Sequence, residues 1–120
     1  NLVGDRAEES LKGIFIDKLF LGADGVDIDG GITTLNPGEA RFNSTMLNSA
    51  HTVIILADHG KIGHKRLIPI SPIGRVHILI TDDGAPEDIL KKMEKKGVRV
   101  EIASLSAQNG SYSQSDYKFK

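Results

Sequence analysis

The chain has 120 residues, of which 39% are hydrophobic and 26% charged, as is typical of one soluble globular domain. A net charge of -1 gives these residues no electrostatic footprint for nucleic acid, and the lack of cysteine excludes disulfides and thiolate chemistry. No apolar run approaches the roughly 20 residues of a membrane helix. We therefore expect a cytoplasmic protein without a membrane partner.

The first part of the chain gives helix and strand signals around one polar loop. Asp5 and Glu8 are spaced as a capping box, which predicts a short helix over residues 5–12. The consecutive bulky residues LFL predict a strand over 18–21, buried on both faces. Aspartates, glycines and threonines predominate in residues 22–36, which predicts a long polar loop.

The middle of the chain predicts a second helix followed by the clearest strand. Asn36 is a good N-cap, Pro37 suits the first helical position, and Glu39 completes a capping box, so a helix is expected over 37–50. The apolar, β-branched run TVIILA predicts a strand over 52–57.

The second half continues the alternation. It predicts an irregular crossover with one short strand, then a strand, a helix with acid first and base last, and an alternating edge strand with one solvated side. These elements lie at 62–75 (short strand at 67–70), 76–81, 86–96 and 98–102. The tail over 104–120 has little to bury, and we expect it to be disordered.

This order of elements predicts an α/β fold. We expect a Rossmann-like, three-layer arrangement with a mostly parallel sheet and helices on both faces. Ligands of such sheets bind at the carboxyl ends of the strands. The polar loops at 22–36 and 58–61 both follow strands, so they are the expected place for a site.

The first polar loop offers groups suited to a phosphate or a polyol. Gly31, Thr33 and Thr34 provide backbone N–H groups and hydroxyls, and the following helix start adds partial positive charge. Asp24, at a strand end, can accept hydrogen bonds from sugar hydroxyls. No strict phosphate fingerprint occurs, so a surface turn that uses glycine and aspartate only for its geometry stays open as the alternative.

The second polar loop and the helix start add two charged candidates. Lys61 follows a buried strand and can point into the same crevice to meet an anion, although an ordinary surface lysine is the alternative. Glu39 either caps its helix or faces a ligand.

No metal, cofactor or catalytic residue is predicted. His59, His64 and Asp58 match no standard metal-site spacing. Serines are numerous, but none lies in a G-x-S-x-G motif and no nucleophile–base pairing is evident.

Three stretches, taken in order, resemble the C-terminal effector-sensing domain of DeoR-type transcriptional regulators. They are IDKLFLGADGVDIDGGITTLNPGEA, VIILADHGKIG and HILITDDGAPEDILKKMEKKGVRVEIA. The shared pattern comprises a strand ending in G-A-D-G, a G-[IL]-T-T-x-N-x-x-E-A run, an A-D-x-x-K-[FI]-G loop and a late I-x-T-D turn. The match covers residues 2–103, so we expect 1–103 to form the C-terminal part of a sugar-phosphate-sensing domain.

The resemblance implies a regulator of sugar catabolism, usually a repressor. Family members bind a phosphorylated sugar, which changes their affinity for operator DNA, and they usually form dimers or tetramers. They contact DNA through an N-terminal helix-turn-helix. Neither that module nor the first half of the sensor domain matches this sequence, which implies a fragment with part of the ligand site. The Gly-Ile-Thr-Thr region leans toward regulators of amino-sugar or galactitol-type pathways.

The same domain is similar in fold to ribose-5-phosphate isomerases and CoA transferases. Asp24 fits the second aspartate of the isomerase motif, but Leu21 stands where the first would be, and Thr33 and Thr34 lie where a catalytic lysine is expected. Loss of these groups removes the means of proton transfer. The resemblance therefore implies a site that binds without chemistry, and a sugar-phosphate isomerase-like enzyme is the alternative.

The family pattern implies two groups of site residues. The implied ligand contacts are Asp24, Gly31, Thr33, Thr34, Glu39 and Lys61. Gly22 and Asp58 are implied to shape the site.

Overall fold

The computed structural model describes residues 13–104. The short helix expected at 5–12 and the tail expected to be disordered, apart from its first residue, lie outside the described residues.

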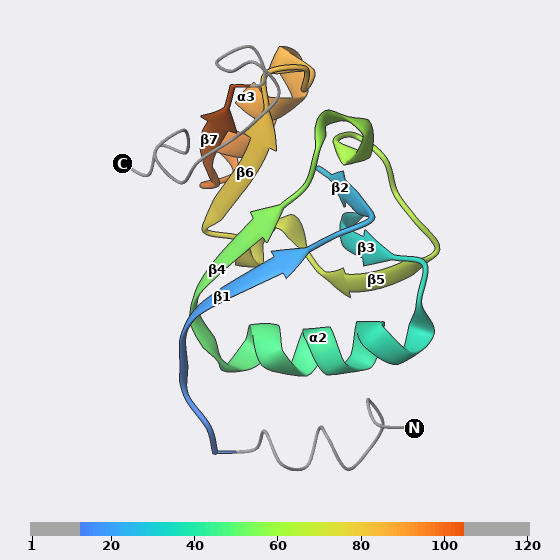
Figure 1. The fold of residues 1–120 in the computed structure, drawn as a ribbon, viewed down its shortest axis with the longest axis vertical. Helices are drawn as coiled ribbons and strands as arrows, with labels where there is room; N and C mark the ends of the chain where they lie inside the picture. The colour runs from blue at the N-terminus through green and yellow to red at the C-terminus, as the bar shows by residue number, and fades with distance from the viewer. Residues whose placement is uncertain (1–12, 105–120) are drawn as a thin grey trace.

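Four strands form one parallel sheet in the order β1-β4-β6-β7. They are β1 (Ile16–Gly22), β4 (Ala50–Leu56), β6 (Ile78–Asp82) and β7 (Arg99–Ala103). Figure 1 shows the four strands side by side. The parallel α/β sheet predicted from the sequence is confirmed, and the bounds of each strand lie within two residues of those expected.

The burial expected for the first strand is wrong. β1 was predicted to be buried on both faces, but Phe20 is 54% exposed. β1 lies at the edge of the sheet, and its side chains alternate between a buried and an exposed face. A run of bulky residues therefore marks a strand here without fixing how many of its faces are covered.

The segment 22–36, predicted to be a loop, contains two strands. β2 (Gly25–Asp27) and β3 (Gly31–Thr34) pair antiparallel, and β3 pairs antiparallel with β5 (Ile68–Ser71) in a second sheet of order β2-β3-β5. Val26 and Ile32 oppose each other and are 0% exposed, so this hairpin packs into the core. The short strand expected in the crossover is confirmed as β5.

The two helices expected after residue 36 and after residue 85 are also confirmed. They are α2 (Pro37–Ser49) and α3 (Glu87–Lys95), and two short 3-10 turns, η1 (His59–Lys61) and η2 (Ile73–Arg75), complete the elements of residues 13–104. The Asn36 side chain accepts hydrogen bonds from the N–H groups of Gly38 and Glu39, which is the predicted N-cap. The Glu39 carboxylate does not complete a capping box with any described residue.

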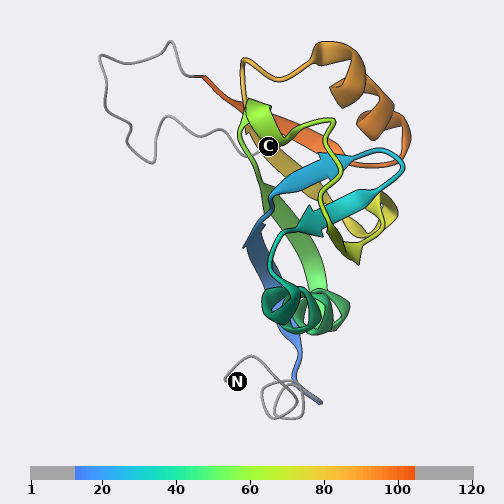
Figure 2. The same ribbon diagram turned by 90° about the vertical axis from the view of Figure 1, so that its right-hand side faces the viewer.

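One face of the parallel sheet carries the hydrophobic core. Its residues are at most 9% exposed and cluster with side chains of both helices and the second sheet: Leu19, Leu21, Val53, Ile55 and Leu79. The opposite face includes Phe20 and Leu56, which are 54% and 40% exposed. Figure 2 shows the helices and the second sheet on one side of the parallel sheet. On the opposite face Ile54 and Ile80 are nevertheless 3% and 7% exposed, so that face is only partly open to solvent.

β7 lies at the other edge of the sheet, as its alternating sequence predicted. The predicted assignment of its faces is wrong at its end, because Ile102 is 40% exposed while the Glu101 side chain is 11% exposed. The Glu101 carboxylate lies 3.2 Å from Nε of Arg99, and this ion pair explains how an acidic side chain is accommodated with little exposure.

Candidate functional site

The carboxyl edge of the parallel sheet brings three aspartates together. Asp24 follows β1, Asp58 follows β4, and Asp82 ends β6. These strands are neighbours and run in the same direction, so the three residues stand in a row along one edge. The two polar loops predicted to form a site therefore do meet at the expected place.

Asp24 is held by the end of the β2–β3 hairpin. Its Oδ2 accepts hydrogen bonds from Oγ1 of Thr34 at 2.9 Å and from the N–H of Leu35 at 3.0 Å. These bonds, the Leu35 N–H first, hold the pKa of the Asp24 carboxyl below its usual value, so the group is ionised at neutral pH. Both bonds reach Oδ2, which leaves Oδ1 free of any described partner.

Lys61 lies in the same cluster. Its Nζ is 3.0 Å from Oδ2 of Asp58, whose Oδ1 accepts the N–H of Gly60. The hydrogen bond from Lys61 is the main reason that the pKa of Asp58 is lowered. The positive charge of Lys61 also lowers the pKa of Asp24, which places the lysine near the first loop. Asp58 thus holds the Lys61 side chain and the following turn, and its site-shaping role stays a prediction.

Arg66 is a further candidate for the site that was not predicted from the sequence. Its Nε donates to the carbonyl oxygen of Asp24 at 3.3 Å, and its charge contributes to lowering the pKa of the Asp24 carboxyl. Arg66 lies in the segment predicted to be an irregular crossover, where no function was assigned. The run His64-Lys65-Arg66, three basic residues after a polar loop, is the signal that could have found it.

Two of the predicted contacts support the hairpin. Thr33 is 1% exposed, and its Oγ1 accepts the N–H of Arg66 at 2.8 Å. Gly31 has φ of +71°, and a Cβ there would meet the carbonyl oxygen of Ser71 at 2.1 Å. Both residues thus have a structural reason for their identity, whatever they contribute to ligand contact.

Glu39 and Gly22 are less well defined by the structure. Glu39 lies in the first turn of α2, and its carboxylate has no partner among residues 13–104. Gly22 ends β1 opposite Leu56, and a Cβ there would have nothing within 4 Å. The ligand contact of Glu39 and the shaping role of Gly22 stay predictions.

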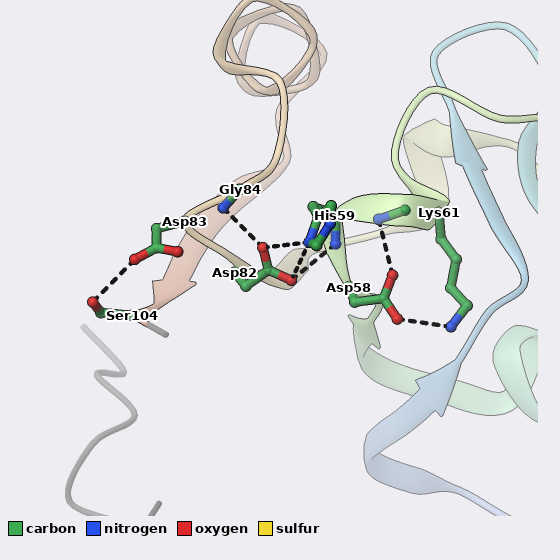
Figure 3. Close-up of polar contacts among 8 residues, drawn as sticks. Asp58, His59, Lys61, Asp82, Asp83, Gly84 and Ser104 are labelled. Carbon is green, nitrogen blue, oxygen red and sulfur yellow. Dashed lines mark hydrogen bonds and ion pairs between the residues drawn. The ribbon is translucent and has the colours of Figure 1, made fainter. Parts of the chain in front are cut away.

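A second pair of charged groups lies further along the edge, at the end of β6. The His59 N–H donates to Oδ2 of Asp82 at 2.9 Å, and the His59 ring nitrogen Nδ1 lies 3.0 Å from Oδ1 (Figure 3). Burial acts to raise the pKa of Asp82, but the N–H groups of His59 and Gly84 and the His59 ring together hold it below the usual value. From the sequence, His59 was a candidate only for a metal ligand, and no group of described residues is suited to hold a metal.

A hollow of about 540 Å³ lies at the opposite, amino edge of the sheet. It is lined by Phe15, Ile16, Asp17, Asn48, Ser49, Ala50 and His51. Among residues 13–104 no lysine or arginine lines it, so these residues offer a phosphate little to bind. The chemistry of the carboxyl edge, with two cationic side chains and several oriented hydroxyls and carboxylates, makes that edge the better candidate.

Comparison with known proteins assigns the chain to a family. The family described as DeoR C terminal sensor domain matches residues 1–83, and the chain belongs to it. The fold therefore defines a sensor domain of the kind found in DeoR-type regulators. No helix among residues 13–104 is long and apolar enough to cross a membrane.

Similar curated proteins are transcriptional regulators by name. The chain is 39% identical over 97 residues to the proposed aga operon transcriptional repressor of Escherichia coli O157:H7, covering 81% of this chain and 36% of that protein. It is 33% identical over 99 residues to the HTH-type transcriptional regulator GlpR of Haloferax volcanii, covering 82% and 39%. The glycerol-3-phosphate regulon repressor of Escherichia coli K12 is 21% identical, with 84% and 40% covered. The chain thus spans about two fifths of the length of these relatives.

Proposed function

We propose that this chain is the effector-binding part of a DeoR-family transcriptional regulator and that its effector is a phosphorylated sugar. The observation that carries the proposal is the convergence of Lys61 and Arg66 on Asp24 at the carboxyl edge of the sheet. Two cations beside a carboxylate can bind both the phosphate and the sugar portion of such a ligand. The cations suit the phosphate, and the free Oδ1 of Asp24 suits a sugar hydroxyl.

The ion pair between Lys61 and Asp58 is well placed to be exchanged for a ligand. The two side chains are 38% and 56% exposed, and exposed ion pairs are worth about 0–1 kcal/mol. A phosphate dianion can therefore replace Asp58 as the partner of Lys61 with little loss of free energy. Asp58 would then hold the lysine in place before binding and release it on binding.

The names of the relatives support the regulatory part of the proposal. Three of them are described as repressors or regulators of transcription, and one name refers to glycerol 3-phosphate. In the proposed mechanism a helix-turn-helix elsewhere in the natural protein binds operator DNA, and the effector changes that affinity. Such coupling requires that the sugar phosphate bind two states of a cytoplasmic homo-oligomer with different affinity.

The site is proposed to bind without catalysing a reaction. Leu21, which stands where an isomerase has an acid/base aspartate, is 9% exposed. Thr33, which lies where the catalytic lysine is expected, has its hydroxyl bonded to the Arg66 N–H. Neither position supplies a group that transfers protons, and this favours a sensor over the isomerase-like alternative.

Calorimetric titration of the full-length protein tests the proposal. The probes are glycerol 3-phosphate, several hexose and hexosamine 6-phosphates, and the same compounds without phosphate. Lys61→Ala should weaken a phosphorylated probe roughly tenfold or more, because a hydrogen bond to a charged group contributes about 1.5–3 kcal/mol. Lys91→Ala, which removes an exposed lysine paired with Glu87 on α3, is the matched control. Equal losses for phosphorylated and free sugars would contradict the proposed phosphate contact.

A further inference from the structure

The imidazole of His59 is held in place by residues at and after the end of β6. Asp82 is 7% exposed, and its carboxylate accepts the N–H of His59, the N–H of Gly84 at 2.8 Å and the ring nitrogen Nδ1. A Cβ at position 84 would lie 3.1 Å from Cγ of His59 and 3.2 Å from Nδ1. The ring is therefore packed against a residue that has no side chain, and its position is set by the backbone around it.

The hydrogen bond to Asp82 decides which ring nitrogen of His59 carries the proton. An ionised carboxylate only accepts hydrogen bonds, so Nδ1 must be the protonated nitrogen when it faces Asp82. In the neutral ring, Nε2 then keeps a lone pair and acts as a hydrogen-bond acceptor. The His59 side chain is 55% exposed, so part of the ring is open to solvent.

The charges on either side of His59 favour a neutral group over an anion. The ring lies against the carboxylate of Asp82, and the carboxylate-bearing Asp58 directly precedes it in the chain. The cations Lys61 and Arg66 instead lie toward the first loop and Asp24. A phosphate is thus drawn to the β1 end of the edge, and hydroxyl groups are the partners that suit the β6 end. Figure 3 shows the His59–Asp82 and Asp58–Lys61 pairs on this edge.

We infer that His59 is a ligand contact of the proposed site, with Nε2 accepting a hydrogen bond from a hydroxyl of the sugar, and that Asp82 is the positioning residue that fixes its tautomer. This inference rests on the proposed function and adds that residues at the β6 end of the edge bind the hydroxyl groups of the sugar. The ligand lies along the carboxyl edge, with its phosphate toward Lys61 and its hydroxyls toward His59.

His59→Asn is the substitution that separates contact from fold. The asparagine amide can stand in for Nδ1 and keep a donor for Asp82, while nothing replaces Nε2. His51→Asn, at the amino end of β4, is the matched control because it removes an exposed histidine far from the carboxyl edge. Thermal melts of both variants verify that each is folded before its affinity is compared.

The measurement is a calorimetric titration of the full-length protein with the tightest-binding sugar phosphate of the panel above and with inorganic phosphate as a competitor. His59→Asn is expected to weaken the sugar phosphate about fivefold, as loss of one hydrogen bond does, and to leave inorganic phosphate unchanged. Unchanged affinity for the sugar phosphate, or equal weakening of both probes, would overturn the inference while leaving the proposed function standing. A wild-type protein that binds no member of the panel would remove the proposed function and this inference with it.

A spectroscopic signature tests the positioning role of Asp82 without any ligand. In protein labelled with ¹⁵N-histidine, the His59 ring should show the tautomer protonated at Nδ1, and Asp82→Asn should shift it toward the other tautomer or a mixture. Adding the sugar phosphate to wild type should then move the Nε2 resonance of His59. A ring protonated at Nε2 in the wild type, or an Nε2 resonance that does not respond at saturation, would contradict the assignment.

Discussion

Substitution of Gly31 by alanine tests the hairpin that carries the candidate site. The position has φ of +71°, and an added Cβ would stand 2.1 Å from the carbonyl oxygen of Ser71 and 2.9 Å from Cα of Pro72. Both neighbours belong to or follow β5, the strand that pairs with β3. The substitution therefore strains the backbone and separates two paired strands at the same point.

The expected loss of stability is the sum of these two effects. A left-handed backbone costs a non-glycine residue about 1–2 kcal/mol. Relieving the contact with backbone atoms costs about 1–3 kcal/mol, as overpacking does. Gly31→Ala should therefore lower the free energy of unfolding by roughly 2–5 kcal/mol, a large share of the 5–15 kcal/mol typical of a domain.

Two other glycines separate the two contributions. Gly97 has φ of +97° but nothing within 4 Å of an added Cβ, and Gly74 has ordinary backbone angles and equal space. In urea unfolding, Gly97→Ala should cost about 1 kcal/mol and Gly74→Ala should stay within about 0.5 kcal/mol of wild type. If Gly31→Ala cost no more than Gly97→Ala, the close packing of β3 against β5 would be refuted.

Three further predictions concern charge and exposure. Arg66→Gln should weaken a sugar phosphate about threefold to tenfold with little change in melting temperature, because the backbone N–H bond to Thr33 is kept and only the exposed bond from Nε to the Asp24 carbonyl is lost; an unaffected affinity would exclude Arg66 from the site. The lowered pKa values of Asp24 and Asp82 contribute stability that is present in full above their usual pKa, near pH 4, and is lost as the pH falls through the lowered values. Unfolding followed by circular dichroism should therefore show stability falling below about pH 4, and a stability that rises there would contradict it. Phe20→Thr should slow aggregation of the 120-residue chain in light-scattering assays, because it replaces a side chain that is 54% exposed on an edge strand; an unchanged rate would show that this face does not drive association.

The parallel sheet could be predicted from sequence because its signals are long and local. The run over 52–57 is continuous and rich in β-branched residues, which marks a strand. The Asn36 cap marks where one helix begins, and the acidic first turn and basic last turn mark both ends of the other. The second sheet could not be predicted, because its strands have only three or four residues. The strand over 25–27 is too short to show an alternation of apolar and polar side chains. Aspartate and glycine in that hairpin also give a loop-like composition. Its pairing with β5 depends on a partner more than 30 residues away.

The residues of the candidate site divide in the same way, into those with a local sequence signal and those that depend on long-range contacts. Asp24 and Lys61 were predicted because each follows a strand whose direction the alternation of elements fixes. Arg66 and the His59–Asp82 pair were missed, since their roles arise from contacts between residues 23 to 42 positions apart. Asp82 is the aspartate of the I-x-T-D turn in the family pattern, and its Oδ1 does accept the N–H of Gly84 in that turn. Sequence spacing does not show that the same carboxylate orients a histidine from the neighbouring strand end.

A crystal structure of the full-length protein with the tightest-binding sugar phosphate tests the central claim most directly. We expect the phosphate within hydrogen-bond distance of Nζ of Lys61, with sugar hydroxyls on Asp24 and His59. Phosphate density in the hollow at the amino edge beside His51, with Lys61 still paired to Asp58, would contradict it.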